Sequence, residues 1–367
     1  MDVRVSDILR MLAEAAPWEL QEVYDNSGLL IGDPDMKVGK ILVAIDVNEE
    51  VVSEALQKGC NLIISHHPLI FKGLKRISSG TGTERSVILA IRHGLAIASY
   101  HTNIDNIETG VNGVIAQKFG LLDTRVLLPR IATMRKLVVF CPVSHVENVR
   151  LAMFDAGAGH IGEYDSCSFN SEGFGTFRAG DGANPFAGQI GVLHQEPEIR
   201  IETIVPAFRL SQAIKSMIAA HPYEEVAYDV YPLENQISTI GSGMIGRLPQ
   251  PLEEGDFLLL CREVFGTACL RHNRFTDKRI VKVAVCGGSG AFLIGDAASQ
   301  FADAFVTADI KYHDFFDAPE NLLVVDAGHY ETEQYTKELI RDIIVKKIPT
   351  FAPLISEVKT NPVHYFT

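Results

Sequence analysis

Asn61-Leu62-Ile63-Ile64-Ser65-His66-His67-Pro68 is an apolar run that stops at two adjacent histidines. Its length, between Gly59 and Pro68, is typical of a strand buried in a parallel sheet. Pro68 cannot continue a ladder and biases His67 towards an extended backbone, so the two imidazoles leave the strand end in different directions. They could then serve two neighbouring metal ions. On this stretch alone a second interpretation is open, in which one histidine packs in the core and the other faces water.

Length and composition limit the classes of protein to which the chain can belong. It has 367 residues, of which 47% are hydrophobic and 22% charged, and this predicts two packed domains. Its 33 basic residues against 46 acidic ones give a net charge of -13, which opposes binding to a phosphate backbone, so nucleic acid is not expected as a partner. Six scattered cysteines without C-x-x-C spacing exclude a disulfide framework and a zinc knuckle. No secretion signal or membrane-spanning stretch is recognised, and we expect a cytoplasmic protein.

The first 128 residues predict an α/β domain. Strands are expected at 41–47, 61–65 and 95–100, with helices at 49–58 and 83–93. This alternation favours a mainly parallel sheet with helices on its faces. Ligands of such sheets bind beyond the carboxyl ends of the strands, which is where His66 and His67 lie.

Residues 129–235 follow a different pattern and predict an inserted domain. The expected order is strand, helix, two strands, helix and strand, which is the order of a ferredoxin-like α+β module. The strands are expected at 136–142, 166–177, 189–204 and 226–231, and the helices at 146–156 and 210–220.

Residues 236–367 return to the first architecture and complete the α/β core. Strands are expected at 280–285, 304–307 and 322–325, and a helix at 329–344. The glycine loop 287–290 follows the first of these strands. It lacks the lysine of a Walker loop, so a tight strand-to-helix turn is as open an interpretation as a phosphate site.

Four strand ends carry side chains that bind metals, and the alternation predicts that they meet at one edge of the sheet. The pairs are His66/His67, His101/Asp105, Asp309/His313 and His329/Glu333. His329 and Glu333 are four residues apart on a helix and therefore share a face. Imidazole and carboxylate together suit zinc, iron or manganese, and a bridging carboxylate makes two divalent ions plausible. Each pair alone could be something simpler, such as a loop hydrogen bond or a capped helix, but four such pairs at strand ends indicate a metal site.

Six motifs, in order along the chain, resemble the NIF-three-like family of dinuclear-metal-centre hexameric proteins, often labelled GTP cyclohydrolase 1 type 2 homologues. The resemblance covers residues 1 to about 128 and about 236 to 367. The motifs are Asp25-Asn26-Ser27-Gly28-Leu29, Ser65-His66-His67-Pro68, His101-Thr102-Asn103-Ile104-Asp105, Gly287-Gly288-Ser289-Gly290, Asp309-Ile310-Lys311-Tyr312-His313 and Gly328-His329-Tyr330-Glu331-Thr332-Glu333.

The resemblance implies a ligand set and an assembly. His66 and His67 would each bind a different ion, Asp105 would join one and His329 the other, and Glu333 would bridge them. The chain would form a homohexamer built from trimers. The insertion resembles the CutA-like or PII-like module of longer bacterial members.

These observations lead to two hypotheses about function. The first is a metal-dependent hydrolase that acts on a small molecule, a nucleotide such as GTP or a cyclic amide, with His101, Asp309 and His313 as candidate general acids or bases. The second is a regulatory or metal-handling hexamer, in which the inserted domain senses a small ligand and the dinuclear site serves storage or structure. A third hypothesis, a DNA-associated protein, is disfavoured by the net charge.

Overall fold

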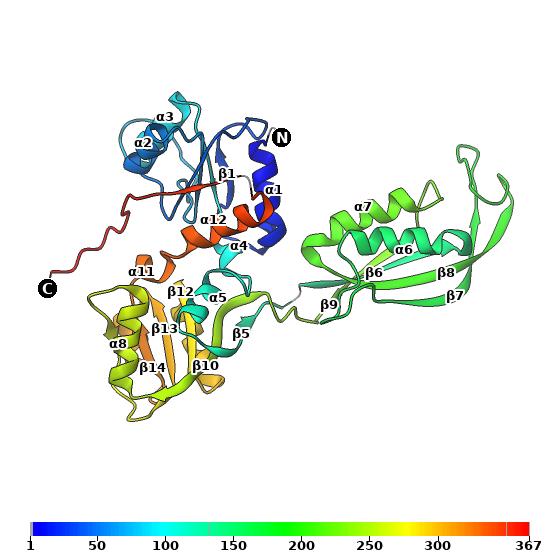
Figure 1. Cartoon of the computed structure of the whole chain (residues 1–367). Helices are drawn as coiled ribbons and strands as arrows, with labels where there is room; N and C mark the ends of the chain where they lie inside the picture. The colour runs from blue at the N-terminus through cyan, green and yellow to red at the C-terminus, as the bar shows by residue number, and fades with distance from the viewer. Residues whose placement is uncertain (1–2, 132, 350, 367) are drawn as a thin grey trace. The chain divides into compact units, whose positions relative to one another are not determined.

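The structure is a computed structural model that describes residues 3–131, 133–349 and 351–366. The chain divides into two compact units (Figure 1). One unit combines the segment that ends at Pro129 with the segment that begins at Ser238, and the other is Arg130–Ile237. The boundaries predicted from the sequence fall after residues 128 and 235. No helix in the described ranges is long and apolar enough to cross a membrane.

The first sheet of the larger unit carries the strand that ends at the paired histidines. Its five strands lie in the order β1-β4-β3-β2-β15, with β1 antiparallel to β4 and the others parallel. The strands are β1 (Gly28–Ile31), β2 (Ile41–Ala44), β3 (Leu62–Ser65), β4 (Ala96–Ser99) and β15 (Leu354–Ile355). Every residue of β2, β3 and β4 is buried, which confirms the predicted buried parallel strands.

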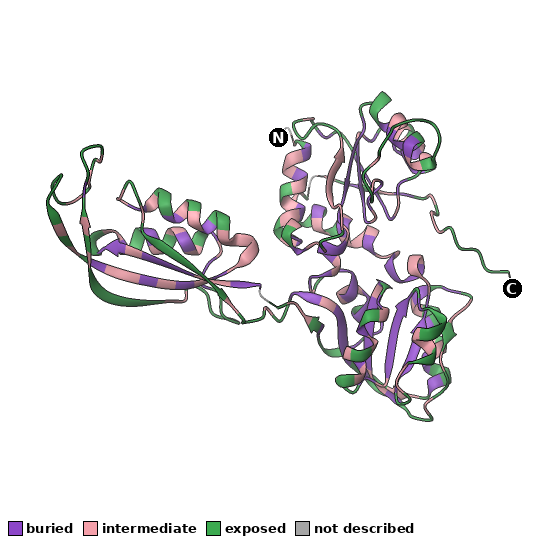
Figure 2. Cartoon of the chain, turned by 180° about the vertical axis from the view of Figure 1, so that it is seen from behind, coloured by how far each residue is buried: buried purple, intermediate pink, exposed green. Residues whose placement is uncertain are grey.

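Helices cover both faces of this sheet. On one face α2 (Glu49–Gln57) and α3 (Gly82–Arg92) form a core with the strands, and their outer surfaces are exposed (Figure 2). Asn48 and Thr81 cap these two helices, since each side chain accepts a hydrogen bond from a backbone N–H of the first turn. The helix α12 (Thr336–Lys347) contacts β2 and packs on α1 (Val5–Ala15). Two short helices, η1 (Trp18–Leu20) and α4 (Thr102–Asp105), complete this half.

The larger unit contains a second sheet, of six strands in the order β11-β14-β13-β12-β10-β5. Its central β12, β13 and β14 are parallel, and the flanking strands are antiparallel to their neighbours. The strands are β5 (Leu122–Pro129), β10 (Gly241–Leu252), β11 (Arg271–His272), β12 (Ile280–Ser289), β13 (Ala304–Ala308) and β14 (Leu323–Asp326). The α/β class is confirmed, but the expectation that all four strand-end loops share one sheet edge is wrong. The later strands β12, β13 and β14 belong to a separate sheet, in which β10 and β5 form the antiparallel edge beside β12.

Short helices surround the second sheet. They are α5 (Val111–Lys118), α8 (Glu254–Phe265), η4 (Ala291–Leu293), α9 (Ile294–Ser299), α10 (Tyr312–Phe316) and α11 (His329–Glu333). α9 and η4 share a core with β12, β13 and β14. The helix expected at 329–344 is two helices, because α11 ends before α12 begins at Thr336. The glycine loop 287–290 is not a turn after the strand, since β12 continues through an irregularity to Ser289.

The smaller unit has the predicted ferredoxin-like connectivity. Its elements are β6 (Met134–Pro142), η2 (Val143–His145), α6 (Val146–Asp155), β7 (Ser168–Arg178), β8 (Leu193–Pro206), η3 (Ala207–Arg209), α7 (Leu210–Ala220) and β9 (Tyr228–Leu233). The antiparallel sheet has the order β7-β8-β6-β9, and both long helices pack on one of its faces. The insertion is thus a βαββαβ module with a core of its own.

Candidate metal centre

His66 and His67 leave β3 in different directions, as the sequence predicted. The His66 side chain is fully buried and its Nδ1 lies 3.0 Å from the backbone oxygen of Tyr100. The Nδ1 of His67 lies 2.7 Å from Oδ1 of Asp46, which follows β2. In each ring this contact occupies Nδ1 and leaves Nε2 for another partner. The two ring centroids lie 4.8 Å apart.

His101 and Asp105 come from the end of the neighbouring strand β4. The Nδ1 of His101 lies 2.8 Å from Oδ1 of Asp25, and the His101 ring lies 5.3 Å from both His66 and His67. Asp25 reaches this position because β1 runs antiparallel to β4, so that the residues before β1 lie beside those after β4. Asp105 Oδ1 lies 3.7 Å from Nε2 of His66.

α11 supplies the opposite wall of the cluster, from the second sheet. Glu333 is 3% exposed, and its two oxygens contact different histidines. Its Oε1 lies 3.6 Å from Nε2 of His66, while its Oε2 lies 2.9 Å from Nε2 of His67 and 3.1 Å from Nε2 of His329. The Nε2 atoms of His67 and His329 are 3.3 Å apart. Glu333 therefore occupies the position of a bridging carboxylate.

All four histidines of the cluster share one arrangement. Each Nδ1 faces a carbonyl or carboxylate oxygen, and for His329 that oxygen is Oδ2 of Asp309 at 2.7 Å. The contact fixes the ring orientation and the tautomer, and directs Nε2 into the cluster. Metal-binding histidines are held in this way, by a carboxylate or a backbone carbonyl on the other ring nitrogen.

Burial and neighbouring charges shift the pKa values of the side chains in the cluster. Burial and then the charge of Glu333 raise the pKa of Asp105 well above its ordinary value. Glu333, in spite of its burial, keeps a pKa well below the ordinary value because imidazoles surround it. Burial lowers the pKa of His66, whereas at His67 the hydrogen bond with Asp46 and the negative charge of Glu333 outweigh burial and raise the pKa to about 10. A cation placed between these groups would favour the ionised form of Asp105 beside the charged Glu333.

The residues fit divalent metal ions. His66 Nε2, Asp105 Oδ1 and Glu333 Oε2 are buried atoms without a well-directed hydrogen bond from any described residue. Such atoms are costly unless something else binds them. Three sets bring their donor atoms close enough to hold an ion: His66/His67/His101, His67/His329/Glu333 and His66/Asp105/Glu333. Nitrogen and oxygen donors without thiolate suit zinc, iron or manganese.

The glycine loop serves this cluster directly. Gly288 has φ of +63°, and a Cβ at this position would lie 2.2 Å from Oε1 of Glu333. Its backbone N–H donates to Oγ1 of Thr332, which is adjacent to Glu333. A residue with a side chain at Gly288 would displace the Glu333 carboxylate, so the loop here makes room for the ligand.

Most of the predicted site residues come together, and His313 does not. His66, His67, His101, Asp105, His329 and Glu333 form the cluster. Asp309, a candidate acid or base, instead orients His329. His313 lies four residues further, exposed on α10, and its ring contacts that of Tyr312. It is too far past the end of β13 to share the edge where Asp309 lies.

Two carboxylates of the site, Asp25 and Asp46, were not predicted from the sequence. Asp46 follows β2 and could have been found by the strand-end argument that identified the histidines. Asp25 could not, because it precedes a strand and reaches His101 only through antiparallel pairing. Hydrogen bonds from His101 and Thr102 outweigh burial and hold the pKa of Asp25 well below its ordinary value.

A cavity of about 340 Å³ opens beside the cluster. His67 and His329 line it together with their partners Asp46 and Asp309, and Arg271 lies at its wall. Residues near the C-terminus, Asn361 to Val363 and Tyr365, also line it. Just before them, the hydroxyl of Thr360 donates to Oδ2 of Asp46. A small molecule in this cavity would lie against two of the candidate ligands.

Known proteins are similar to the chain over nearly its whole length. A family model described as Duf34/NIF3 (NGG1p interacting factor 3) matches residues 3–362. A protein of Halalkalibacterium halodurans named GTP cyclohydrolase 1 type 2 homolog is 39% identical over 360 residues, which are 97% of both chains. A Bacillus subtilis protein of the same name is 36% identical over 370 residues, 98% of each. The crystal structure of a Bacillus cereus protein related to NIF3 covers both chains fully, with a TM-score of 0.88 and 40% identity.

Proposed function

The chain belongs to the Duf34/NIF3 family, and from that premise we propose that it is a hydrolase with two divalent metal ions. The observation that carries the proposal is the shared orientation of four clustered imidazoles, three of them beside Glu333, each with its Nδ1 bound to a carbonyl or carboxylate oxygen. Three of the Nε2 atoms, those of His66, His67 and His329, lie beside one buried carboxylate, and His101 lies next to two of these rings. Packing alone does not require this orientation, whereas binding of metal ions does.

The donor sets support an assignment of the ligands. His66 and Asp105 would hold one ion, His67 and His329 the other, and Glu333 would join both through its two oxygens. Zinc is the first candidate for this donor set, followed by iron or manganese. Two such ions supply Lewis acidity and a bound water that ionises near neutral pH.

The protein's own residues would orient the substrate and move protons. His101 has Nδ1 held by Asp25 and Nε2 directed at His66 and His67, so it can add a ligand or hold a proton at Nε2. Asp46 and Asp309 keep His67 and His329 in position and line the neighbouring cavity. Arg271 pairs with Asp326 through one end of its guanidinium, but its side chain is 59% exposed, and its remaining N–H groups could face an anionic group of a substrate there.

The substrate class is a small molecule with a hydrolysable C=N, amide or phosphoester bond. The name of the relatives supports GTP as the first compound to test, and cyclic amides follow from the proposed bond class. The test is turnover by the full chain loaded with zinc, iron or manganese, beside a Glu333→Gln variant. We expect wild-type turnover that the variant lacks, and failure of the wild type with GTP, cyclic amides and phosphoesters alike would remove the hydrolase proposal.

We also propose the trimer-based homohexamer that the family resemblance implies. Light scattering on the purified chain should then give six times the 40.3 kDa of one copy. A monomeric or dimeric mass at micromolar concentration would contradict this assembly.

A second candidate function, regulation through the inserted domain, is favoured by one observation. The inserted unit has a cavity of about 640 Å³, larger than the one beside the metal cluster. Removing 130–237 should leave bound metal and any turnover intact if the function is enzymatic, and should abolish only a response to ligand if the domain is a sensor.

A further inference from the structure

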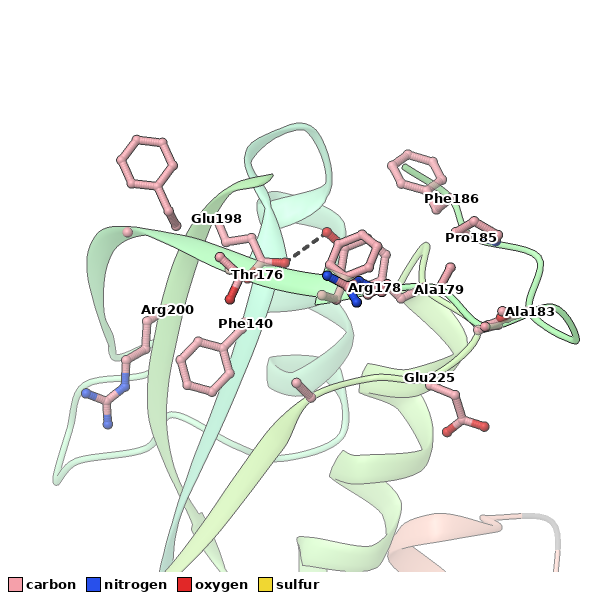
Figure 3. A pocket seen from close by; sticks show the side chains of 18 of the residues that line it. Phe140, Thr176, Arg178, Ala179, Ala183, Pro185, Phe186, Glu198, Arg200 and Glu225 are labelled. Carbon is pink, nitrogen blue, oxygen red and sulfur yellow. Dashed lines mark hydrogen bonds between the residues drawn. The ribbon is translucent and has the colours of Figure 1, made fainter. Parts of the chain in front are cut away.

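The cavity of about 640 Å³ lies wholly within the inserted unit, against β7 and β8 and the segment before β9 (Figure 3). Its size is in the range of sites for small organic molecules. None of the candidate metal ligands lines it, so whatever it binds is separate from the proposed hydrolysis.

Glu198 of β8 gives the cavity a buried carboxylate. The residue is 8% exposed, and its Oε1 accepts a hydrogen bond of 2.8 Å from the hydroxyl of Tyr223. The other oxygen, Oε2, lies over Gly175 of β7, where a Cβ would come within 2.1 Å of it. The glycine thus leaves room for the carboxylate beside the cavity.

No cation pairs with this carboxylate among the described residues. Its one side-chain partner is the neutral Tyr223 hydroxyl, and Arg200, on the same face of β8, pairs instead with Glu202 at 3.0 Å. A buried carboxylate normally has a charged or multiply donating partner, because an unpaired one is costly. A ligand with N–H donors would supply that partner.

Aromatic rings form the walls around Glu198. The ring of Tyr223 lies 6.0 Å from that of Phe177 and 6.1 Å from that of Phe186. Phe140 and Phe174 also line the cavity. Phe174 is 69% exposed and Phe186 is 52% exposed, which is a large apolar surface for a free protein to leave in water.

The charges around the cavity favour a ligand that is neutral or positive. Four carboxylates line it, from Glu172, Glu198, Glu224 and Glu225, against the guanidinium groups of Arg178 and Arg200. Arg200 is already paired with Glu202. The faces of aromatic rings also carry a negative electrostatic potential, which attracts planar cations.

We propose that this cavity binds a planar, N–H-rich small molecule, of the guanidinium or amino-heterocycle type, which stacks on the aromatic walls and donates its N–H edge to Glu198. The pairing of a planar donor edge with a carboxylate is strong and directional. The site goes beyond the proposed hydrolase function, and it gives the inserted domain a ligand of defined chemistry.

The test is isothermal titration of the full chain with two probes, agmatine for the guanidinium type and guanosine for the amino-heterocycle type. We expect at least one of them to bind with one site per chain. Glu198→Gln should weaken that binding by about tenfold to a hundredfold, because it exchanges a charged acceptor for a neutral amide. Phe186→Ala, on an exposed loop, should weaken it about fivefold or more without affecting folding.

Two control variants show whether a loss of binding is specific to this cavity. Glu196→Gln changes a carboxylate on the same strand that does not line the cavity, and it should bind the probe as the wild type does. His67→Ala, altered in the metal cluster, should also bind normally, which separates failure here from failure of the hydrolase proposal. The inference is overturned if neither probe binds at millimolar concentration, or if Glu198→Gln and Phe186→Ala both bind like the wild type.

Discussion

Replacing Gly288 by alanine should remove metal from the cluster, although Gly288 is not itself a ligand. A Cβ on Gly288 would lie 2.2 Å from Oε1 of Glu333, whereas side-chain carbons do not approach other atoms closer than 3.0 Å. The carboxylate would therefore have to move by about 1 Å. Metal–ligand distances tolerate only about 0.2 Å. Since Glu333 contacts three histidines, the displacement should weaken binding of both ions.

The backbone cost of this change can be measured separately. Gly288 has φ of +63°, and so does Gly94, whose Cβ would meet nothing within 4 Å. The left-handed backbone should therefore cost each alanine a similar amount, about 1–2 kcal/mol, and Gly288→Ala carries the clash with Glu333 in addition. Only Gly288→Ala should also lose metal affinity, by about tenfold to a hundredfold or more, which is the effect of disturbing the support of a ligand.

The assay is elemental analysis of both variants and the wild type after dialysis against a zinc buffer, together with thermal unfolding. We expect Gly94→Ala to hold as much zinc as the wild type and Gly288→Ala to hold clearly less. Equal zinc in Gly288→Ala and the wild type would refute the argument that the glycine loop makes room for the Glu333 carboxylate.

Three further changes test the surroundings of the cluster. Asp46→Asn removes the carboxylate behind His67 and should lower metal affinity about tenfold to a hundredfold in a competition titration, and unchanged affinity would deny Asp46 its positioning role. His313→Ala should leave metal content and any turnover at the wild-type level, because its ring lies outside the cluster, and a loss of either would return it to the site. A chelator should lower the midpoint of thermal unfolding, and added zinc should restore it, because ligands that bind only the folded state stabilise it; an unchanged midpoint would mean that no metal is linked to folding.

The sequence located the histidines of the cluster because the rule that finds them is local. His66 and His67 follow a recognisable buried strand, and His329 and Glu333 are one helical turn apart. Each pair follows the carboxyl end of a parallel strand, where ligands of such sheets bind, although the two strands belong to different sheets. Local patterns were therefore enough to predict which loops carry candidate ligands.

Features that depend on pairing between distant segments could not be predicted in this way. The short antiparallel β1 brings Asp25 to His101. Asp25 begins one of the six motifs of the family resemblance, but the motif does not indicate that its partner is His101. The separate second sheet depends on the pairing of β10 with β5 across the insertion. The role of Gly288 depends on Glu333, which lies far along the chain, so the glycine loop alone was ambiguous.

The measurement that tests the dinuclear site most directly is the metal content of three purified proteins: the wild type, His67→Ala and Glu333→Ala. A dinuclear site with these ligands predicts about two ions per chain in the wild type, about one in His67→Ala, and almost none in Glu333→Ala, because Glu333 contacts the ligands of both ions. Equal metal content in all three proteins, or a wild type without bound metal after zinc loading, would contradict it.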